Sequence, residues 1–337
     1  STKSKLYLLF LIFKIFVMKK YNILIPIIIT LLLIECSNEI DDTNDISQVE
    51  LNSEETESNS SSSENNSTTD SQSDELSFDH SKMLANWVDN IIIPSISNFE
   101  NSLNLLKETA EVFVNAPTAE TLSKLKEDWL SSFLKWQHIE MFDIGLAEEI
   151  YYKNRINLYP ANVDKIENNI LYQDYNLDEP ANFSSQGFNA IDYLLFGIAD
   201  SDSEVISKFA SEDSKYGKYL NHLINKMIVL TSDVKLSWNQ EYRNSFISST
   251  DNTATSSINK MVNDFIFYFE KGYRANKIGI PAGVFSDSPL PDRVEAFHGK
   301  NYSKILALEA TDAINNFFNG RYSGNVESSD LSINDYL

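Results

Sequence analysis

Cysteine and histidine are scarce in this sequence, and basic residues are clearly outnumbered by acidic ones. The chain of 337 residues contains one cysteine, Cys36, and four histidines. A single cysteine excludes a disulfide within the chain. Lysine and arginine number 27 against 49 aspartates and glutamates, which gives a formal net charge of −22. No basic patch of the kind that nucleic acid requires is visible, so we expect no nucleic-acid partner.

Several catalytic motifs are also missing. The sequence has no Gly-x-Ser-x-Gly elbow and no glycine-rich phosphate loop after a strand. No thiol follows Cys36, and no histidine is followed three residues later by glutamate. Nucleophilic catalysis therefore has little support. Regular alternation of apolar and polar residues, the mark of strands, is not evident either.

The first 36 residues resemble a bacterial lipoprotein signal. Met18 and two lysines precede the apolar run 21–34, and the sequence Leu33-Ile34-Glu35-Cys36 ends it. This order predicts cleavage before Cys36 and attachment of lipid to it. Because Glu35 stands where a small residue is usual, an uncleaved membrane anchor is the alternative. We expect the true start at Met18; a helical hairpin that includes the apolar residues 6–17 is the other interpretation.

An acidic tract follows the cysteine. Residues 37–79 contain 13 aspartates and glutamates, no lysine or arginine, and mainly serine and asparagine otherwise. Such a segment repels itself and has little apolar surface to bury, which predicts a disordered tether. Glu39, Asp41 and Asp42 resemble a surface-export signal, although they can equally be the start of an acidic linker. We therefore divide the chain into a targeting segment (1–35), a lipidated tether (36–79), a folded domain (80–325) and a tail (326–337).

The folded domain is predicted to be helical throughout. From His80 onward, apolar residues recur every three or four positions, which indicates amphipathic helices. Pro94 predicts a kink in the first helix, and Thr118 predicts the cap of the second, which should run to about Ile144 and close at Gly145. Further helices are expected over 188–196, 203–247, 255–274 and 301–319, with an irregular loop over 277–291. The fold class is therefore all-α, with the architecture of a helical bundle.

Six segments in order resemble the imelysin family, which is also known as peptidase family M75. No single segment is specific, but together they span roughly residues 83–320. The segments are Trp136–Gly145, Ile156–Pro160, Gly187–Gly197, the helix from Tyr219 to Trp238, Lys277–Pro281, and Arg293-Val294-Glu295 before Tyr302. The resemblance implies a two-part helical fold with a functional groove between the halves. It also implies an envelope lipoprotein with a role in iron uptake.

The segment GFNAIDYLLFG resembles the family's Gly-x-His-x-x-Glu motif, with two changes. Asn189 replaces the histidine and Asp192 replaces the glutamate. A His-x-x-Glu pair presents a metal-binding nitrogen and a carboxylate on one helix face. The amide of Asn189 is neutral and a weak metal donor, and Asp192 is one methylene shorter than glutamate. A hard cation with oxygen ligands tolerates these changes better than zinc does. The alternative is that both residues are hydrogen-bonded polar groups in the groove.

Other polar residues in the family-like segments are candidates for the same groove. Glu140 is either a groove acid or half of a solvated pair with Asp143. Arg293 and Glu295 are interpreted most simply as an internal ion pair that fixes their loop. Of the four histidines, the two in family-like segments deserve testing, although a surface or capping role is the simpler assignment. The groove candidates are Asn189, Asp192, Glu140, His138, Arg293, Glu295 and His298, the last sharing a face with Glu295 if that segment is helical.

The resemblance and the residues together predict binding rather than turnover. We expect a lipoprotein of a Gram-negative cell envelope, anchored to the outer membrane through Cys36, that serves iron or heme uptake as a non-catalytic accessory. Candidate partners are the membrane, iron or heme, and uptake-system proteins; iron or another divalent metal is the candidate cofactor. One alternative is a metallopeptidase of the same family, which would need about three protein ligands for zinc. The other is a surface module that binds a protein or glycan in the groove.

Overall fold

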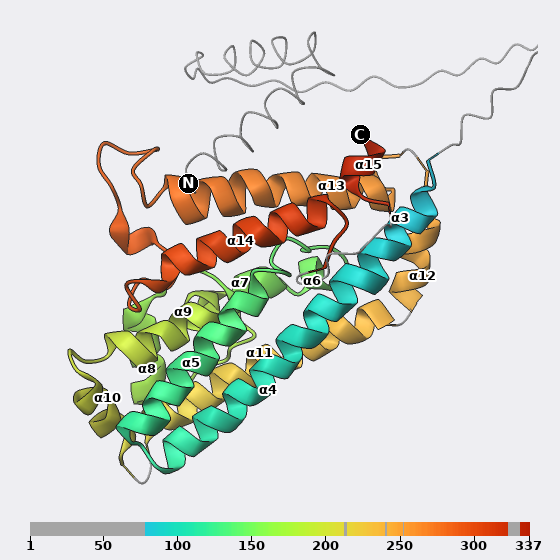
Figure 1. Ribbon diagram of the computed structural model, residues 1–337. Helices are drawn as coiled ribbons and strands as arrows, with labels where there is room; N and C mark the ends of the chain where they lie inside the picture. Colours follow the sequence, from blue (N-terminus) through green and yellow to red (C-terminus); the bar gives the residue numbers. More distant parts are fainter. Residues whose placement is uncertain (1–77, 212–213, 240, 252, 323–330) are drawn as a thin grey trace, which may run out of the picture. The chain divides into compact units, whose positions relative to one another are not determined.

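The computed structural model describes residues 78–211, 214–239, 241–251, 253–322 and 331–337. The expected signal segment, Cys36 and all but the last two residues of the acidic tether lie outside these ranges. Every regular element in the described ranges is helical, which confirms the all-α class (Figure 1). None of the helices in these ranges combines the length and the apolar character that crossing a membrane would require.

The first long helix changes type along its length. Helix α3 (His80–Asn86) passes through a π-helical segment, η1 (Trp87–Ile92), into α4 (Ile93–Asn115). Pro94 lies in the first turn of α4, directly after the π-helical segment. Proline has no N–H to donate to the preceding turn, so the regular α pattern restarts there. The break expected at Pro94 is thus present as a change of helix type.

Helices α4, α5 and α11 form one layer. Helix α5 (Ala119–Trp136) begins at Thr118, which forms a capping box with Thr121. Helix α4 packs against both α5 and α11 (Lys215–Asn239), as Figure 1 shows. Aromatic side chains fill the core beside α5, where the rings of Phe133 and Phe188 stack with centroids 4.2 Å apart. Burial of such large rings supplies much of the hydrophobic stabilisation of a helical core.

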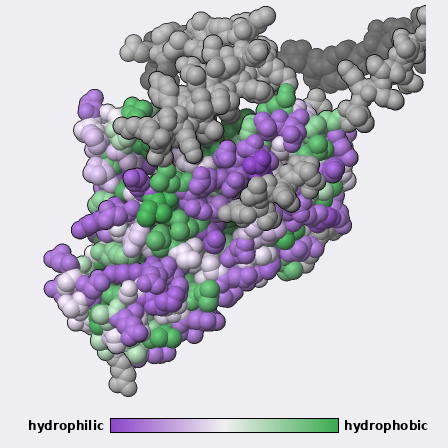
Figure 2. Space-filling view, in the orientation of Figure 1, coloured by the Kyte–Doolittle hydropathy of each residue, from purple (hydrophilic) through white to green (hydrophobic). Residues whose placement is uncertain are grey.

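A second set of helices covers this layer. Helix α13 (Ser257–Phe267) continues as the π-helical segment η4 (Tyr268–Gly279), and α14 (Tyr302–Phe318) packs along η4. Figure 1 shows α13 in orange and α14 in red above the layer of α4, α5 and α11. The exposed surface is mainly hydrophilic, and an apolar patch lies over α14 in Figure 2. Ile305 and Leu308 are the exposed apolar residues of that helix.

Short helices connect these layers and shape the region between them. Their order along the chain determines which loops lie between the two helix sets. They are α6 (Leu146–Glu149), α7 (Tyr152–Ile156), α8 (Val163–Tyr172), η2 (Pro180–Ser185), α9 (Gly187–Asp192), η3 (Tyr193–Gly197), α10 (Asp202–Phe209), α12 (Glu241–Ser248), η5 (Pro291–Arg293) and α15 (Ile333–Tyr336). Helix α15 lies within the expected tail, and its Ile333 is buried against the core.

Three expected boundaries were wrong. Helix α5 ends at Trp136 rather than near Ile144, because the next backbone N–H groups bond carbonyls three residues back and form tight turns. Gly145 precedes α6 instead of closing α5. The helix expected over 203–247 is divided into α10, α11 and α12. Apolar spacing continues across each of these breaks, so spacing alone does not reveal them.

Candidate functional site

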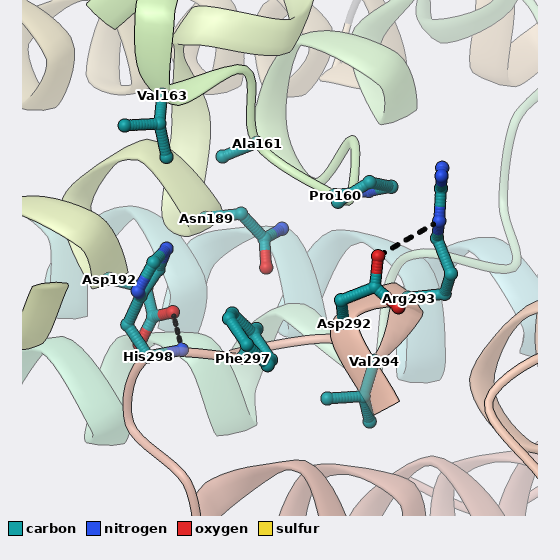
Figure 3. Close-up of a pocket in the computed structure, with 10 residues that line it drawn as sticks. All are labelled: Pro160, Ala161, Val163, Asn189, Asp192, Asp292, Arg293, Val294, Phe297 and His298. Carbon is teal, nitrogen blue, oxygen red and sulfur yellow. Dashed lines mark hydrogen bonds and ion pairs between the residues drawn. The ribbon is translucent and has the colours of Figure 1, made fainter. Parts of the chain in front are cut away.

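A pocket of about 260 Å³ lies between α9, the segment 160–163 and the loop that follows η5. Pro160, Ala161 and Val163 form one apolar wall. Figure 3 shows Asp192 with His298 at one end and Asp292 with Arg293 at the other, with Phe297 between them. Four of the seven groove candidates therefore line one pocket: Asn189, Asp192, Arg293 and His298.

The glycine of the motif sets the position of α9. Gly187 has a φ of +74°, a region that other residues rarely adopt. A Cβ at this position would lie 2.2 Å from the carbonyl oxygen of Ile156. Only glycine therefore allows α9 to begin directly against the end of α7. This contact brings Asn189 next to Asn157, the first residue after α7.

Asn189 connects two backbone segments. Its Nδ2 donates to Oδ1 of Asn157 at 2.8 Å, and its Oδ1 accepts from the backbone N–H of Ala296 at 3.0 Å. The side chain is 3% exposed, so neither bond competes with bulk water. Both polar atoms of the amide are therefore occupied by the protein itself. The interpretation of Asn189 as a hydrogen-bonded polar group describes this geometry.

Asp192 holds the same loop at two further points. Its carboxylate accepts from the backbone N–H groups of His298, at 2.8 Å, and Gly299, at 2.9 Å. Burial raises the pKa of Asp192 to about 7, although the two backbone donors act in the opposite direction. No ion pair with Asp192 forms among the described residues. A buried carboxyl that titrates near neutrality in a pocket is a common feature of functional sites.

A buried lysine lies behind Asn189. Lys277 Nζ is 2.9 Å from Glu140 Oε2 and 2.6 Å from Glu295 Oε1. Asn157 Nδ2 donates to both carboxylates, at 2.7 Å and 2.6 Å, and so links this ion cluster to Asn189. Tyr268 donates its hydroxyl to Glu140 at 3.2 Å. The ion cluster, defined as Glu140, Lys277 and Glu295, thus supports the pocket from behind.

The two carboxyls of the ion cluster titrate differently. Burial opposes ionisation of Glu140, but the Lys277 ammonium outweighs it and lowers the pKa of that carboxyl. Burial and the charge of Glu140 raise the pKa of Glu295 in spite of Lys277. Because Lys277 faces two carboxylates, its own pKa is raised even though burial lowers it. Glu295 is therefore the carboxyl that takes up a proton first.

Two unpaired acceptors identify the place for that proton. Within the described residues, Oε2 of Glu295 and Oε1 of Gln137 are buried and lack a hydrogen-bond partner. Gln137 Nε2 already donates weakly to Glu295 Oε1 at 3.4 Å. A proton taken up by Glu295 would sit on Oε2, because Lys277, Asn157 and Gln137 all donate to Oε1. It would also bring the ion cluster to zero net charge, which burial favours.

The structure contradicts several of the pairings expected among the candidate residues. The interpretation of Arg293 and Glu295 as an ion pair was wrong: Arg293 is exposed, 3.4 Å from Asp292, and Glu295 is paired with Lys277. Residues 294–300 form turns, so Glu295 and His298 share no helix face. Glu140 is buried in the ion cluster and is not a solvated pair with Asp143. His138 bonds Glu309 on α14 at 2.6 Å and is not among the pocket-lining residues.

Sequence reasoning missed the centre of this arrangement. Lys277 was expected in a loop but lies in η4, and it was not proposed as a site residue; neither were Asn157, Gln137 and Tyr268. A weak signal existed for Asn157, which is the single polar residue inside the apolar run INLYP; Lys277 follows Asn276 directly and gives no such signal. A lone polar residue in an apolar run is either exposed or paired internally. Spacing cannot decide between these two outcomes.

The donor set of the pocket does not fit a zinc peptidase. Within the described residues, no three histidine, cysteine, aspartate or glutamate side chains are placed to share a metal ion. The pocket offers one imidazole, from His298, together with the oxygens of Asn189 and Asp192, which already accept backbone N–H bonds. A zinc peptidase site requires about three protein ligands and a water. We therefore derive no hydrolytic step at this pocket.

The fold is all-helical and consists of two helix sets. Between them lies a small pocket that is lined by apolar and polar side chains. The family model for imelysin matches residues 92–333, and the chain belongs to the imelysin family. Iron-regulated protein A of Synechococcus elongatus is 23% identical over 259 residues, which cover 74% of this chain and 67% of the relative.

Two solved structures share the fold. One, from Parabacteroides distasonis, is named as a precursor of iron-regulated protein A; it has a TM-score of 0.57, 16% identity, and coverage of 74% of this chain and 76% of its own. The other is an imelysin-like protein from Psychrobacter arcticum with a TM-score of 0.56, 20% identity, and coverage of 70% and 72%. At these identities the likeness supports the fold alone.

Proposed function

We propose that this chain is a non-catalytic binding protein of the cell envelope that holds a small iron chelate in the pocket beside α9. The proposal rests on the hydrogen bonds that Asn189 and Asp192 accept. Their oxygens bind the backbone of the opposite wall and so build the pocket, and the described residues contain no group of three histidine, cysteine, aspartate or glutamate side chains placed to hold a metal ion. A preformed concave site with apolar walls and a few polar groups is typical of small-molecule binding.

The size of the pocket favours a small ligand over heme. Pockets for drug-sized ligands measure roughly 300–1,000 Å³, and this one measures about 260 Å³. A whole porphyrin would not be enclosed in that space, whereas a chelate of the size of ferric citrate would. The connection with iron comes from the relative in Synechococcus, which is named iron-regulated protein A.

The proposed location rests on the beginning of the chain. The basic, apolar and cysteine-containing order of residues 18–36 supports a lipid anchor at Cys36, and the one similar structure that is named as a precursor agrees with export. The long acidic tract would then hold the helical domain away from the outer membrane of a Gram-negative cell. Uptake-system proteins are the partners that this position would serve.

Calorimetry on the metal-stripped full-length chain tests the proposal. Ferric citrate should bind with 1:1 stoichiometry, and Ala161→Phe, which fills the apolar wall, should weaken binding at least about tenfold. Val229→Phe places the same side chain at an exposed position of α11 and is the matched control. Absence of ferric citrate binding, or equal binding by the two variants, would overturn the proposal.

Restoring the family motif separates this function from a metallopeptidase. The double variant Asn189→His/Asp192→Glu introduces the missing imidazole and the longer carboxylate. Gain of zinc or iron affinity together with cleavage of unfolded substrates would show that the groove retains peptidase geometry. We expect neither, because the larger side chains displace the acceptor atoms that hold residues 296–299.

A further inference from the structure

One wall of the pocket is a short loop without regular structure. We define the wall loop as residues 294–300, between η5 and α14; Val294, Phe297 and His298 from this loop line the pocket. Its two ends are secured. Glu295 is paired with Lys277 in the ion cluster, and Tyr302, at the start of α14, packs against Trp129 with ring centroids 5.5 Å apart. The middle of the loop faces α9 across the pocket, as Figure 3 shows.

The backbone of the wall loop is strained. Ala296 has a φ of +54° and Lys300 a φ of +55°, both in the left-handed region that side-chain-bearing residues seldom occupy. Such conformations persist only where the surroundings impose them. Hydrogen bonds within the loop add little stability at its centre, since the backbone nitrogen of Lys300 lies 3.4 Å from the carbonyl oxygen of Phe297. The closed conformation therefore depends on contacts outside the loop.

Two side chains of α9 supply those contacts. Asn189 accepts from the N–H of Ala296, and Asp192 accepts from the N–H groups of His298 and Gly299. The fit is close, because a Cβ on Gly299 would lie 3.0 Å from Asp192 Oδ1 and 2.6 Å from the Tyr302 ring. Three backbone N–H groups of a strained loop are thus held by two residues one helical turn apart.

We infer that the wall loop is a movable side of the pocket, that Asn189 and Asp192 latch it closed, and that the ligand enters when the latch opens. The entry of a ligand rests on the proposed function. The latch itself does not, since it concerns contacts within the protein. Loss of either acceptor should free the backbone of the loop while the ion cluster continues to hold its first residues.

The groups around Asp192 determine how pH acts on the latch. From the wall loop and η5 these are His298, Arg293 and Asp292; from η3 and α8, Tyr193 with its acceptor Glu167; and from α14, Tyr302. None of them forms an ion pair with Asp192 among the described residues. Burial also lowers the pKa of His298, so its imidazole is neutral near pH 7 and offers no compensating charge.

The sign of the pH effect follows from burial. With the loop closed, burial raises the pKa of Asp192 to about 7. With the loop open, the carboxyl is hydrated and its pKa returns to about 4. The closed state therefore binds the proton more tightly, and rising pH favours opening. For these two pKa values, the open population should increase about tenfold between pH 6 and pH 8.

Amide hydrogen exchange on the full-length chain tests the latch. After correction for the intrinsic rate, protection of the His298 and Gly299 amides should fall about tenfold from pH 6 to pH 8. Asp192→Asn, which keeps the shape but cannot ionise, should abolish this pH dependence. Asn189→Ala should lower protection at Ala296 while the pH dependence at His298 and Gly299 remains.

A matched control and a ligand measurement complete the test. Asp264→Asn removes another buried carboxyl, on α13, and should leave the wall loop unchanged. Protection that is independent of pH in the wild type, or an unchanged pH slope in Asp192→Asn, would overturn the latch. With ferric citrate as probe, the association rate should rise with pH in the wild type only. If ferric citrate fails to bind, the proposed function fails, while the exchange result still decides the latch.

Discussion

Lys277 is the residue on which the electrostatics of the interior depend. Its side chain is 2% exposed and is the cation shared by Glu140 and Glu295. A buried ion pair adds little stability compared with apolar side chains that fill the same space. Removal of one of its members, however, leaves a buried charge without a partner and destabilises the fold. Substitutions in this ion cluster should therefore change the stability of the fold.

Lys277→Met should destabilise the fold by about 3–5 kcal/mol, because two buried carboxylates lose their counter-ion. Urea unfolding at neutral pH, followed by circular dichroism, measures the loss. Lys124→Met is the control, since Lys124 is an exposed lysine that pairs with Asp128 on α5, and its loss should leave the stability almost unchanged. A similar cost for the two variants would mean that the ion cluster does not stabilise the fold.

Glu295→Gln and Glu140→Gln should differ in cost. Glu295 is the one of the two carboxyls whose pKa is raised, so a neutral isostere there removes the charge that Lys277 balances least and should change stability by less than about 1 kcal/mol. Glu140 carries the charge that balances Lys277, and its amide variant should lose about 2–3 kcal/mol. Urea midpoints of the two variants, measured side by side, decide this, and the reverse order would assign the proton to Glu140.

At the scale of helices, one contact joins the two helix sets through a second buried carboxyl. Asp264 on α13 accepts from the backbone N–H of Asp143, in the turn region after α5, at 2.8 Å. Burial raises the pKa of Asp264 to about 6. An aspartate in the unfolded chain has a pKa of about 3.9. The folded state therefore binds this proton more tightly than the unfolded state does.

The consequence is a loss of stability as pH rises. The contribution of Asp264 is fully present below about pH 4 and is lost as pH increases to about 6, by roughly 1–2 kcal/mol for a partly buried group. Asp264→Asn should remove this dependence. Its free energy of unfolding relative to the wild type should therefore increase between pH 4 and pH 6. Urea unfolding at a series of pH values checks this, and parallel curves for the two proteins would contradict it.

Helix positions were predictable from sequence to the extent that apolar spacing defines them. The long helices and the capping role of Thr118 follow from local chemistry. The end of α5 does not, because the turns after Trp136 are imposed by the burial of Gln137 and Glu140 against η4. Likewise, the spacing of Asn189 and Asp192 placed both on α9, but the backbone N–H groups that donate to them lie more than 100 residues further along the chain. Such long-range pairing leaves no local pattern in the sequence.

For the whole molecule, charge is distributed unevenly along the chain. Residues 37–79 carry 13 of the 49 acidic residues and no basic ones, and the single cysteine follows the apolar run 21–34 by two positions. If lipid on Cys36 anchors the chain, we expect a segment of this composition to hold the folded domain away from an anionic membrane surface.

Cys36→Ala is the direct test of that attachment. If lipid on Cys36 is the anchor, the variant should move from the membrane fraction to the soluble fraction, because a processed chain without lipid retains no apolar segment before the acidic tract. Fractionation of cells with antibody detection measures the distribution. A conservative change in the same segment, Ser37→Ala, is the control and should remain with the membrane. Persistence of Cys36→Ala in the membrane fraction would instead support an uncleaved helix over residues 21–34 as the anchor.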